Sequence, residues 1–178
     1  MKDGRPPFAS LIVPRESAVV LIADRRVGED ISDEEWSGAA FRELLAAAER
    51  HGVALLLLVG PGEASEGDRS RTLWFDSANP FADPAVQGRL ARLHRSRLIL
   101  GGAMAETALT FLALSALEDG YDVYLLRDLI SGASESLAET AVARMIQAGA
   151  VPVSTMQVIA EWGCETGKAA TRRFRKAG

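Results

Sequence analysis

Short apolar runs alternate with amphipathic segments along most of the chain, and this alternation constrains the fold more than any other feature. Apolar runs typical of strands fall at residues 18–23, 53–59, 72–75, 97–101, 122–127 and 151–154. Helical patterns fall between them, at residues 33–51, 83–95, 106–119, 134–148 and from residue 156 onward. Strands that alternate with helices predict a three-layer α/β/α fold with a doubly wound, mainly parallel sheet of about five to six strands. We expect one domain over residues 1–178, with Ser32 or Asp33 capping the first helix.

Several polar or glycine-containing segments come directly after the predicted strands. Asp24 ends the first strand, the Gly60 loop ends the second, a turn at residues 102–108 follows the third strong strand, and Asp128 ends the fourth. The carboxyl ends of parallel strands meet at one edge of the sheet, where ligands bind in this class of fold. The sequence therefore predicts a site at that edge.

The turn at residues 102–108 joins an apolar strand to a helix. A group on such a turn lies near backbone N–H donors and the positive end of a helix dipole. This setting lowers the pKa of a thiol and activates it as a nucleophile. The turn contains no cysteine, however, because the one cysteine of the chain is Cys164. A single cysteine also excludes an internal disulfide and a zinc site made of several cysteines.

The chain resembles the isochorismatase-like hydrolases, also called cysteine hydrolases, and in particular a branch of hydrolases without an assigned substrate. The resemblance rests on three segments: AVVLIADRRVG at residues 18–28, LILGGAMAETALTFLALSALEDGYDVYLLRD at 98–128, and AETAVARMIQAGAVPVSTMQVIAEW at 138–162. Residues 60–82 match the family least. The resemblance implies hydrolysis of a small amide, imide or vinyl ether by an Asp, a Lys and a Cys nucleophile.

The resemblance assigns roles to individual positions. The family Asp corresponds to Asp24, and the family Cys corresponds to Ala108, so the nucleophile is absent. The oxyanion turn corresponds to Ala103, Met104 and Ala108, with a cis peptide bond expected between Ala103 and Met104. The family Lys falls near Trp74, and Arg71 is the nearby candidate for its charge.

Further residues are candidates for the walls of the pocket, each with an ordinary structural alternative. Arg26 either pairs with Asp24 or faces solvent, and Arg71 is equally typical of an exposed loop. Trp74 and Phe81 suit either a pocket or a subunit interface. Glu106 either joins the site or stabilises the start of its helix. For Asp128 we expect a structural hydrogen-bonding role.

Composition and short motifs limit the classes of partner and cofactor that we expect for this chain. The net charge of −4 argues against nucleic-acid binding. No apolar run approaches the roughly 20 residues of a membrane span, and the N-terminal residues do not match a signal peptide, so we expect a cytoplasmic protein. His51 and His94 lack the spacing of a metal site, and no phosphate-binding or dinucleotide-binding motif occurs, so we expect no cofactor. The resemblance implies a small-molecule ligand and a homo-oligomer, a dimer or larger.

Three hypotheses about function remain open at this point. The chain is a hydrolase whose Cys has been replaced by Ala108, or a natural non-catalytic homologue that binds a small molecule or acts as an assembly partner. In a third hypothesis, Asp24 works with Arg26 or Arg71 and a bound water by acid–base catalysis without a covalent step. The absence of the Lys as well as the Cys favours the second hypothesis.

Overall fold

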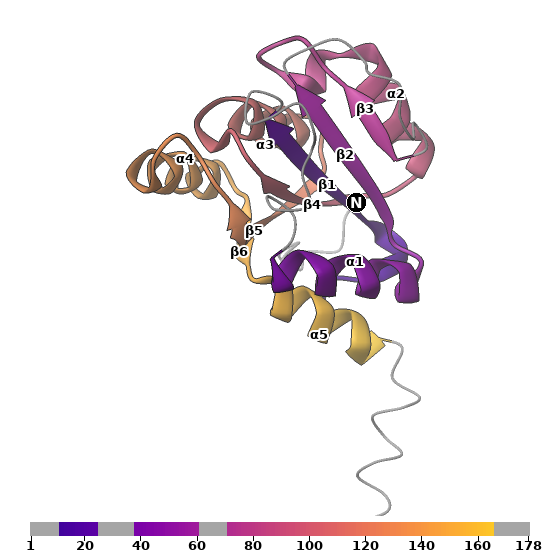
Figure 1. Cartoon of the computed structure of the whole chain (residues 1–178). Coiled ribbons are helices and arrows are strands. Elements are labelled where there is room, and N and C mark those ends of the chain that lie inside the picture. Colours follow the sequence, from indigo (N-terminus) through magenta and orange to yellow (C-terminus); the bar gives the residue numbers. More distant parts are fainter. Residues whose placement is uncertain (1–10, 25–37, 61–70, 166–178) are drawn as a thin grey trace, which may run out of the picture.

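The computed structural model describes residues 11–24, 38–60 and 71–165 of the 178-residue chain. These residues form a parallel sheet with helices on both sides (Figure 1). The strands are β1 (Ser17–Asp24), β2 (Ala54–Gly60), β3 (Thr72–Trp74), β4 (Arg97–Gly102), β5 (Asp122–Ile130) and β6 (Val151–Val153). The α-helices are α1 (Ala39–His51), α2 (Pro84–Leu93), α3 (Thr110–Glu118), α4 (Glu135–Gln147) and α5 (Thr155–Glu165). Short helical segments are η1 (Pro14–Glu16), η3 (Pro80–Ala82) and the π-helical η4 (Ala105–Leu109).

The strand order is β3-β2-β1-β4-β5-β6, and every neighbouring pair is parallel. The chain moves outward from β1 to β3, then returns beside β1 as β4 and moves outward the other way. The order therefore reverses between β1 and β4, and the carboxyl ends of these two strands form the switch point where ligands bind in such sheets. The predicted doubly wound, mainly parallel sheet of five to six strands is confirmed.

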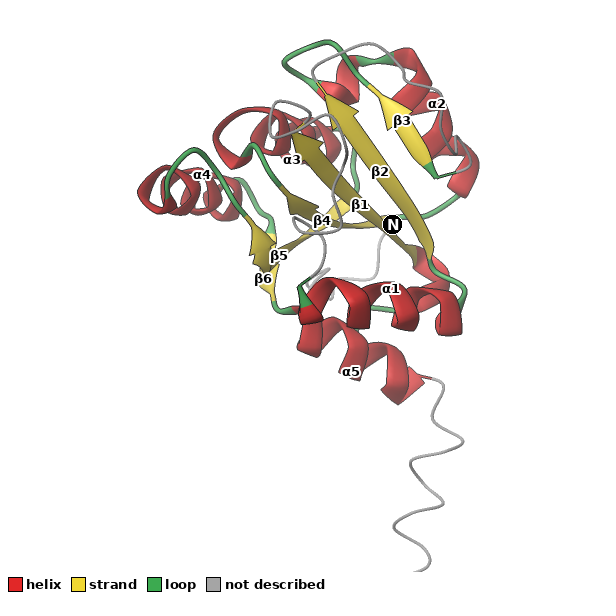
Figure 2. Cartoon of the chain, in the orientation of Figure 1, coloured by secondary structure: helices red, strands yellow, loops and turns green. Residues whose placement is uncertain are grey.

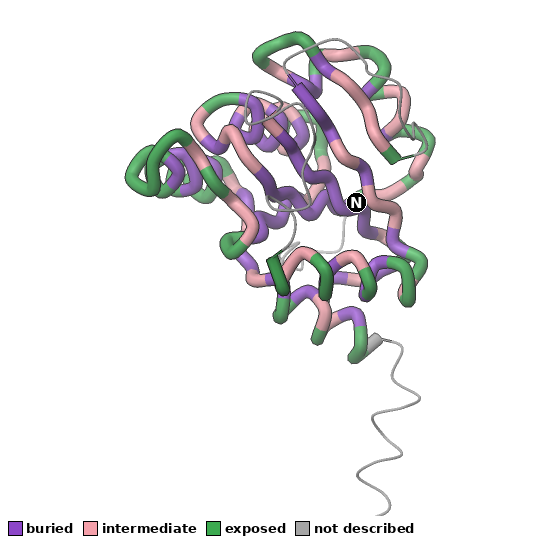
Figure 3. The backbone as a smooth tube through the Cα atoms, viewed as in Figure 1, coloured by how far each residue is buried: buried purple, intermediate pink, exposed green. Residues whose placement is uncertain are grey.

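Two clusters of buried apolar side chains cover the two faces of the sheet. Helices lie on both sides of the strands (Figure 2), and the strands are largely buried (Figure 3). Helices α2, α3 and α4 pack on one face, against alternate residues of β1 such as Val20 and Ile22. Helices α1 and α5 pack on the other face, against Val19 and Leu21. Strands covered on both faces are continuously apolar, which is why they could be recognised from the sequence.

Local sequence signals explain most helix starts. The carboxylate of Asp83 accepts a hydrogen bond from the N–H of Ala85 at 2.8 Å, and the Ser134 hydroxyl accepts one from Leu137 at 3.3 Å. The start predicted for the first helix was wrong. Helix α1 begins at Ala39 after Gly38, whose side chain cannot cap it, and the expected caps at residues 32 and 33 lie outside the described residues.

Strand β5 is longer than predicted because it bulges at its carboxyl end. Leu100 of β4 pairs with Leu125, whereas Gly102 pairs with Ile130, so two steps along β4 correspond to five along β5. The extra residues loop outward at the sheet edge and carry Asp128 with them. The strand predicted from the sequence ended at Arg127, because the apolar run stops there, and an apolar run does not reveal a bulge.

In the part of the chain that the structure describes, none of the helices has the length and apolar character needed to cross a bilayer.

Gly102 lies directly against the backbone of β1 at Ile22. Its φ of 111° is left-handed, and a Cβ at this position would overlap the backbone carbonyl oxygen of Ile22. Gly120 also has a left-handed φ, of 91°, but a Cβ there would meet nothing within 4 Å. The two glycines therefore separate the cost of backbone conformation from the cost of crowding.

We predict that Gly102→Ala lowers the free energy of unfolding by more than about 3 kcal/mol, because strain and backbone overlap add together. Gly120→Ala should cost only about 1 kcal/mol, the cost of a left-handed residue with a Cβ. Urea unfolding followed by circular dichroism measures both. Equal losses for the two variants would show that the approach of β1 to β4 is not tight.

Candidate functional site at the carboxyl edge

The candidate site is built where β1 and β4 end side by side. Ile22 pairs with Gly102, and the N–H of Ala103 donates a 2.8 Å hydrogen bond to the carbonyl of Ile22. Asp24 follows two residues after Ile22 as the last residue of β1. Because alternate residues of a strand share a face, Asp24 lies on the Ile22 face of the sheet. Ala108 is fully buried in the apolar cluster of that same face.

The backbone after β4 has an uncommon conformation. Met104 adopts a left-handed conformation with φ 57° and ψ 42°, which costs a residue with a Cβ roughly 1–2 kcal/mol. The next turn is π-helical rather than α-helical: the Leu109 N–H donates to the Met104 carbonyl at 3.2 Å, five residues earlier. Single π-helical turns occur frequently at functional sites. The strained turn falls on Ala103, Met104 and Ala108, the positions that the resemblance assigns to the oxyanion turn; the cis bond stays a prediction.

Hydroxyl groups near Ala108 do not take the place of a thiol. Thr110 is buried and its hydroxyl donates a 2.6 Å hydrogen bond to the carbonyl of Ala105, which ties the wide turn together. Thr107 is exposed at the surface of the turn. Cys164 is exposed. It stands near the end of α5, roughly 14 Å along the helix from its start at Thr155.

Glu106 connects the turn to the segment that follows β5. One carboxylate oxygen, Oε1, accepts a hydrogen bond from the N–H of Ala133 at 2.9 Å. The other, Oε2, is buried against Gly132 and has no hydrogen-bond partner among the described residues. Ser131 adds two backbone bonds: its carbonyl accepts from Ala105 and its N–H donates to Gly102, both at 3.0 Å. The loop after β5 thus clamps the turn from the side opposite β1.

Asp128 fixes the first turn of α5. Its carboxylate accepts hydrogen bonds from the Thr155 N–H at 3.0 and 3.2 Å and from the Thr155 hydroxyl at 3.2 Å. These contacts agree with the structural role expected from the sequence.

A cavity of about 310 Å³ opens beside Asp128, between the start of α1, the turn at Gly102 and Ala103, and the bulge of β5.

The structure does not bring every candidate residue to this edge. Arg71 precedes β3 at the opposite, amino edge, where its guanidinium lies 3.4 Å from the carboxylate of Glu49. Trp74 ends β3 at the carboxyl edge, but it pairs with Val59 and so lies on the α1 face, away from Ala108. Arg26 lies outside the described residues.

Phe81 is a core residue rather than a pocket wall. It is buried, and its ring meets that of Tyr121 edge-on with centroids 6.3 Å apart. Tyr121 follows the carboxyl end of α3, at the amino edge of the sheet. Burial, followed by the charge of Asp119, raises the pKa of Tyr121. Phe81 therefore packs at the end of the molecule opposite the candidate site.

Phe75 was not singled out from the sequence, yet it borders the site. Asp24 pairs with Gly60, and a Cβ at Gly60 would lie 2.5 Å from the Phe75 carbonyl oxygen and 2.8 Å from its ring. The buried Phe75 ring thus occupies the space beyond Gly60 on the Asp24 face. The alternation of residues 72–75 could have revealed this, because Phe75 and Trp74 must face opposite sides.

Among the described residues, no group of three potential metal-ligating side chains gathers at this edge or elsewhere.

Comparisons with known proteins agree with this architecture. Residues 75–157 match the isochorismatase domain model. This match supports the isochorismatase-like superfamily that the sequence resembles. Among solved structures, the octameric hydrolase of unknown specificity YcaC from Escherichia coli is 21% identical, with a TM-score of 0.70 over 88% of this chain and 83% of that one. No curated protein matches the sequence.

Two further solved structures have the same fold. YcaC from Pseudomonas aeruginosa, solved with hexane-2,5-diol and covalent acrylamide, is 21% identical with a TM-score of 0.70, over 86% of this chain and 83% of that chain. A cysteine hydrolase from Pseudomonas syringae pv. phaseolicola is 12% identical with a TM-score of 0.70, over 91% of this chain and 99% of that chain. At these identities the likeness establishes the isochorismatase-like fold.

We predict that Asp128→Ala lowers the free energy of unfolding by about 1–2 kcal/mol, because the start of α5 loses its capping carboxylate. The control is Asp76→Ala, at an exposed position, which should change stability by less than about 0.5 kcal/mol. Urea unfolding measures both variants. A cost for Asp128→Ala no larger than that of Asp76→Ala would contradict the capping role.

Proposed function

We propose that this domain is a superfamily member that binds a small amide or imide at the carboxyl edge of the sheet and has lost thiol-based hydrolysis. The observation that carries the proposal is the strained turn around Ala108. The turn keeps its left-handed Met104 and its π-helical segment although position 108 holds only a methyl group. Backbone strain of this kind persists where the surrounding structure enforces it, as in ligand sites.

The hydrogen-bonding groups of the turn suit a carbonyl oxygen. The N–H groups of Ala103, Ala105, Thr107 and Leu109 donate to protein carbonyls. Glu106 and Ala108 also lie at the start of this helical segment. We assign their N–H groups to the ligand carbonyl, at the positive end of the helix dipole.

Asp24 supplies the complementary acceptor. Its carboxylate lies at the end of β1 on the Ala108 face, where it would accept an N–H from the ligand. An amide or imide offers both the acceptor and the donor that this pair of sites requires, whereas a vinyl ether offers no N–H. The chain lacks the family Lys, so it lacks a positive charge that hydrolysis would use. The buried ring of Phe75 lies beside Gly60 at this edge.

Assembly is the second candidate function. The E. coli relative YcaC is octameric, and Leu11, Leu137 and Met156 are large apolar residues with exposed fractions of 50%, 49% and 67%. We propose a homo-oligomer on these grounds. The cytoplasmic location and the lack of a nucleic-acid partner stay predictions from the sequence.

Restoring the thiol tests the function. We predict that Ala108→Cys, in a Cys164→Ser background, reacts with acrylamide at position 108 and gains slow ammonia release from primary amides. The thiolate adds to the amide carbon, the nitrogen takes up the proton that the thiol lost and leaves as ammonia, and water hydrolyses the thioester to a carboxylate and free thiol. Intact-mass spectrometry and an ammonia assay give the two readouts, and the parent chain with Cys164 alone is the control.

The parent chain should release no ammonia, while acetamide should compete with acrylamide for the Ala108→Cys variant because both occupy one site. If neither acrylamide nor acetamide engages the variant, and amides do not bind the parent chain, the ligand-binding function is wrong. The assembly role then becomes the better account.

A further inference from the structure

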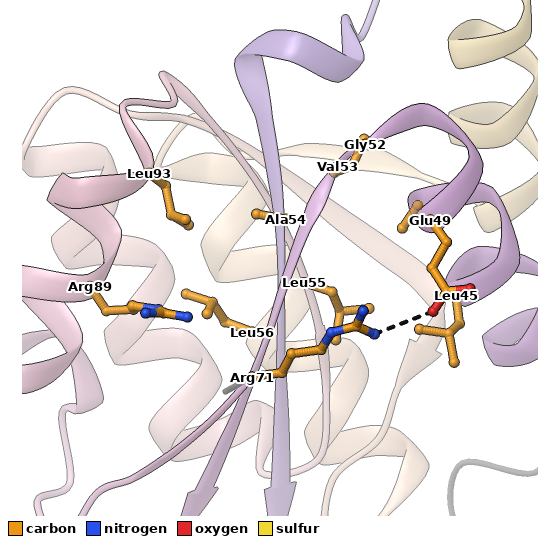
Figure 4. A pocket seen from close by; sticks show the side chains of 11 residues that line it. Leu45, Glu49, Gly52, Val53, Ala54, Leu55, Leu56, Arg71, Arg89 and Leu93 are labelled. Atoms are coloured by element: carbon orange, nitrogen blue, oxygen red, sulfur yellow. Dashed lines mark hydrogen bonds and ion pairs between the residues drawn. The ribbon is translucent and has the colours of Figure 1, made fainter. Parts of the chain in front are cut away.

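A second cavity lies at the amino edge of the sheet, at the end opposite the candidate site (Figure 4). Its volume is about 470 Å³, within the range of roughly 300–1,000 Å³ that small-molecule sites occupy. The last turns of α1, the first residues of β2, Arg71 before β3, and α2 form its walls. Nothing in the carboxyl-edge chemistry uses this cavity.

The cavity exists because β3 is much shorter than β2. The ladder between them begins only at Leu57, which pairs with Thr72. The N–H of Leu57 donates to the Arg71 carbonyl at 2.8 Å, so the backbone groups of Leu57 point toward the β3 side. Leu55, two residues earlier, points its N–H and C=O the same way but precedes the ladder with β3.

Leucines form the floor of the cavity on both sides of β2. Figure 4 shows Leu56 and Leu93 on one side of the strand and Leu45 and Leu55 on the other. Leu56 is buried, and the other three leucines are half-buried. This apolar floor suits a ligand with a compact hydrocarbon body, which gains free energy by covering it.

Among the described residues that line the cavity, the charged groups are two guanidinium groups and one carboxylate. Arg89 extends from α2 toward Leu56, and Arg71 lies across β2 from it and points toward Glu49 (Figure 4). The Arg71–Glu49 pair has one contact of 3.4 Å between side chains that are 54% and 60% exposed. An exposed pair with such a contact contributes little to stability, so a competing anion can displace it.

We propose that this cavity binds a small organic carboxylate with a compact apolar body. The ligand carboxylate takes the place of Glu49 on Arg71, because a guanidinium binds a carboxylate through two parallel N–H donors. Arg89 adds a second positive charge, and the hydrocarbon part lies on the leucine floor. Glu49 acts as an internal competitor that occupies Arg71 when the cavity is empty.

Benzoate and its neutral isostere benzamide test the proposal in ¹H–¹⁵N correlation spectra of the full chain. Benzoate should give saturable shifts at the amides of Leu55 and Arg71, while benzamide at the same concentrations leaves these amides unmoved. Arg71→Gln should weaken benzoate binding several-fold, and Glu49→Gln should strengthen it by a similar factor by removing the competitor. The matched control is Arg92→Gln on α2, whose Nε donates to the Gly88 carbonyl at 3.0 Å outside the cavity.

Each contrary outcome overturns the proposal. Equal binding of benzamide would show that charge does not drive binding, and unchanged affinity in Arg71→Gln would remove the guanidinium from the site. Shifts confined to Ala103 and Asp128 would place the carboxylate at the other edge. A change of molar mass in Arg71→Gln without benzoate would make the cavity an interface between copies. All three variants are at exposed positions, and circular dichroism confirms that each is folded before titration.

Discussion

The backbone contact between the end of β1 and the end of β4 is the constraint on which the rest of the structure depends. The Ile22 carbonyl accepts the N–H of Ala103, and the space beside it admits only a glycine at position 102. This contact sets the direction in which the chain leaves the sheet. The left-handed Met104 and the π-helical turn follow from that direction, and they place Ala108 on the face that Asp24 shares.

The loop after β5 holds the same turn from its other side. Ser131 bonds to Gly102 and Ala105, and the Glu106 carboxylate accepts from Ala133. The bulge in β5 makes these contacts reachable, because it brings the chain back beside β4 at Ile130. The site turn is thus held between β1 and the β5 loop, and these contacts fix its shape with only a methyl group at position 108. The proposed ligand site depends on this fixed shape.

The sequence was sufficient for the class of sheet, because strands buried on both faces leave continuous apolar runs and the intervening helices have a clear period. It was also sufficient for the edge at which Asp24 and the turn meet, since parallel topology alone dictates that. It failed where an outcome depends on which end or face of a short strand a residue occupies. Arg71 and Trp74 are close in sequence, yet one precedes β3 at the amino edge and the other faces α1.

Tertiary contacts explain the other differences. Phe81 belongs to the core because η3 packs beside α3, a contact that no local pattern records. Helix α1 begins at Ala39, after a glycine, so no polar capping residue in the sequence marks its start. Phe75 could have been found by its alternation with Trp74, but only once the pairing of β3 with β2 was known. The shortness of β3 explains why the prediction placed Arg71 at the wrong edge, and it also leaves room for the cavity at the amino edge.

The proposed function requires above all that Asp24 and position 108 share one site. The most direct measurement is the pKa of a thiol placed at that position by Ala108→Cys, from the pH dependence of its alkylation, with and without Asp24→Asn. A carboxylate within about 4–6 Å disfavours the thiolate, so neutralising Asp24 should lower the thiol pKa, whereas Asp76→Asn at an exposed position should not. An identical thiol pKa with and without the Asp24 charge would contradict the shared site.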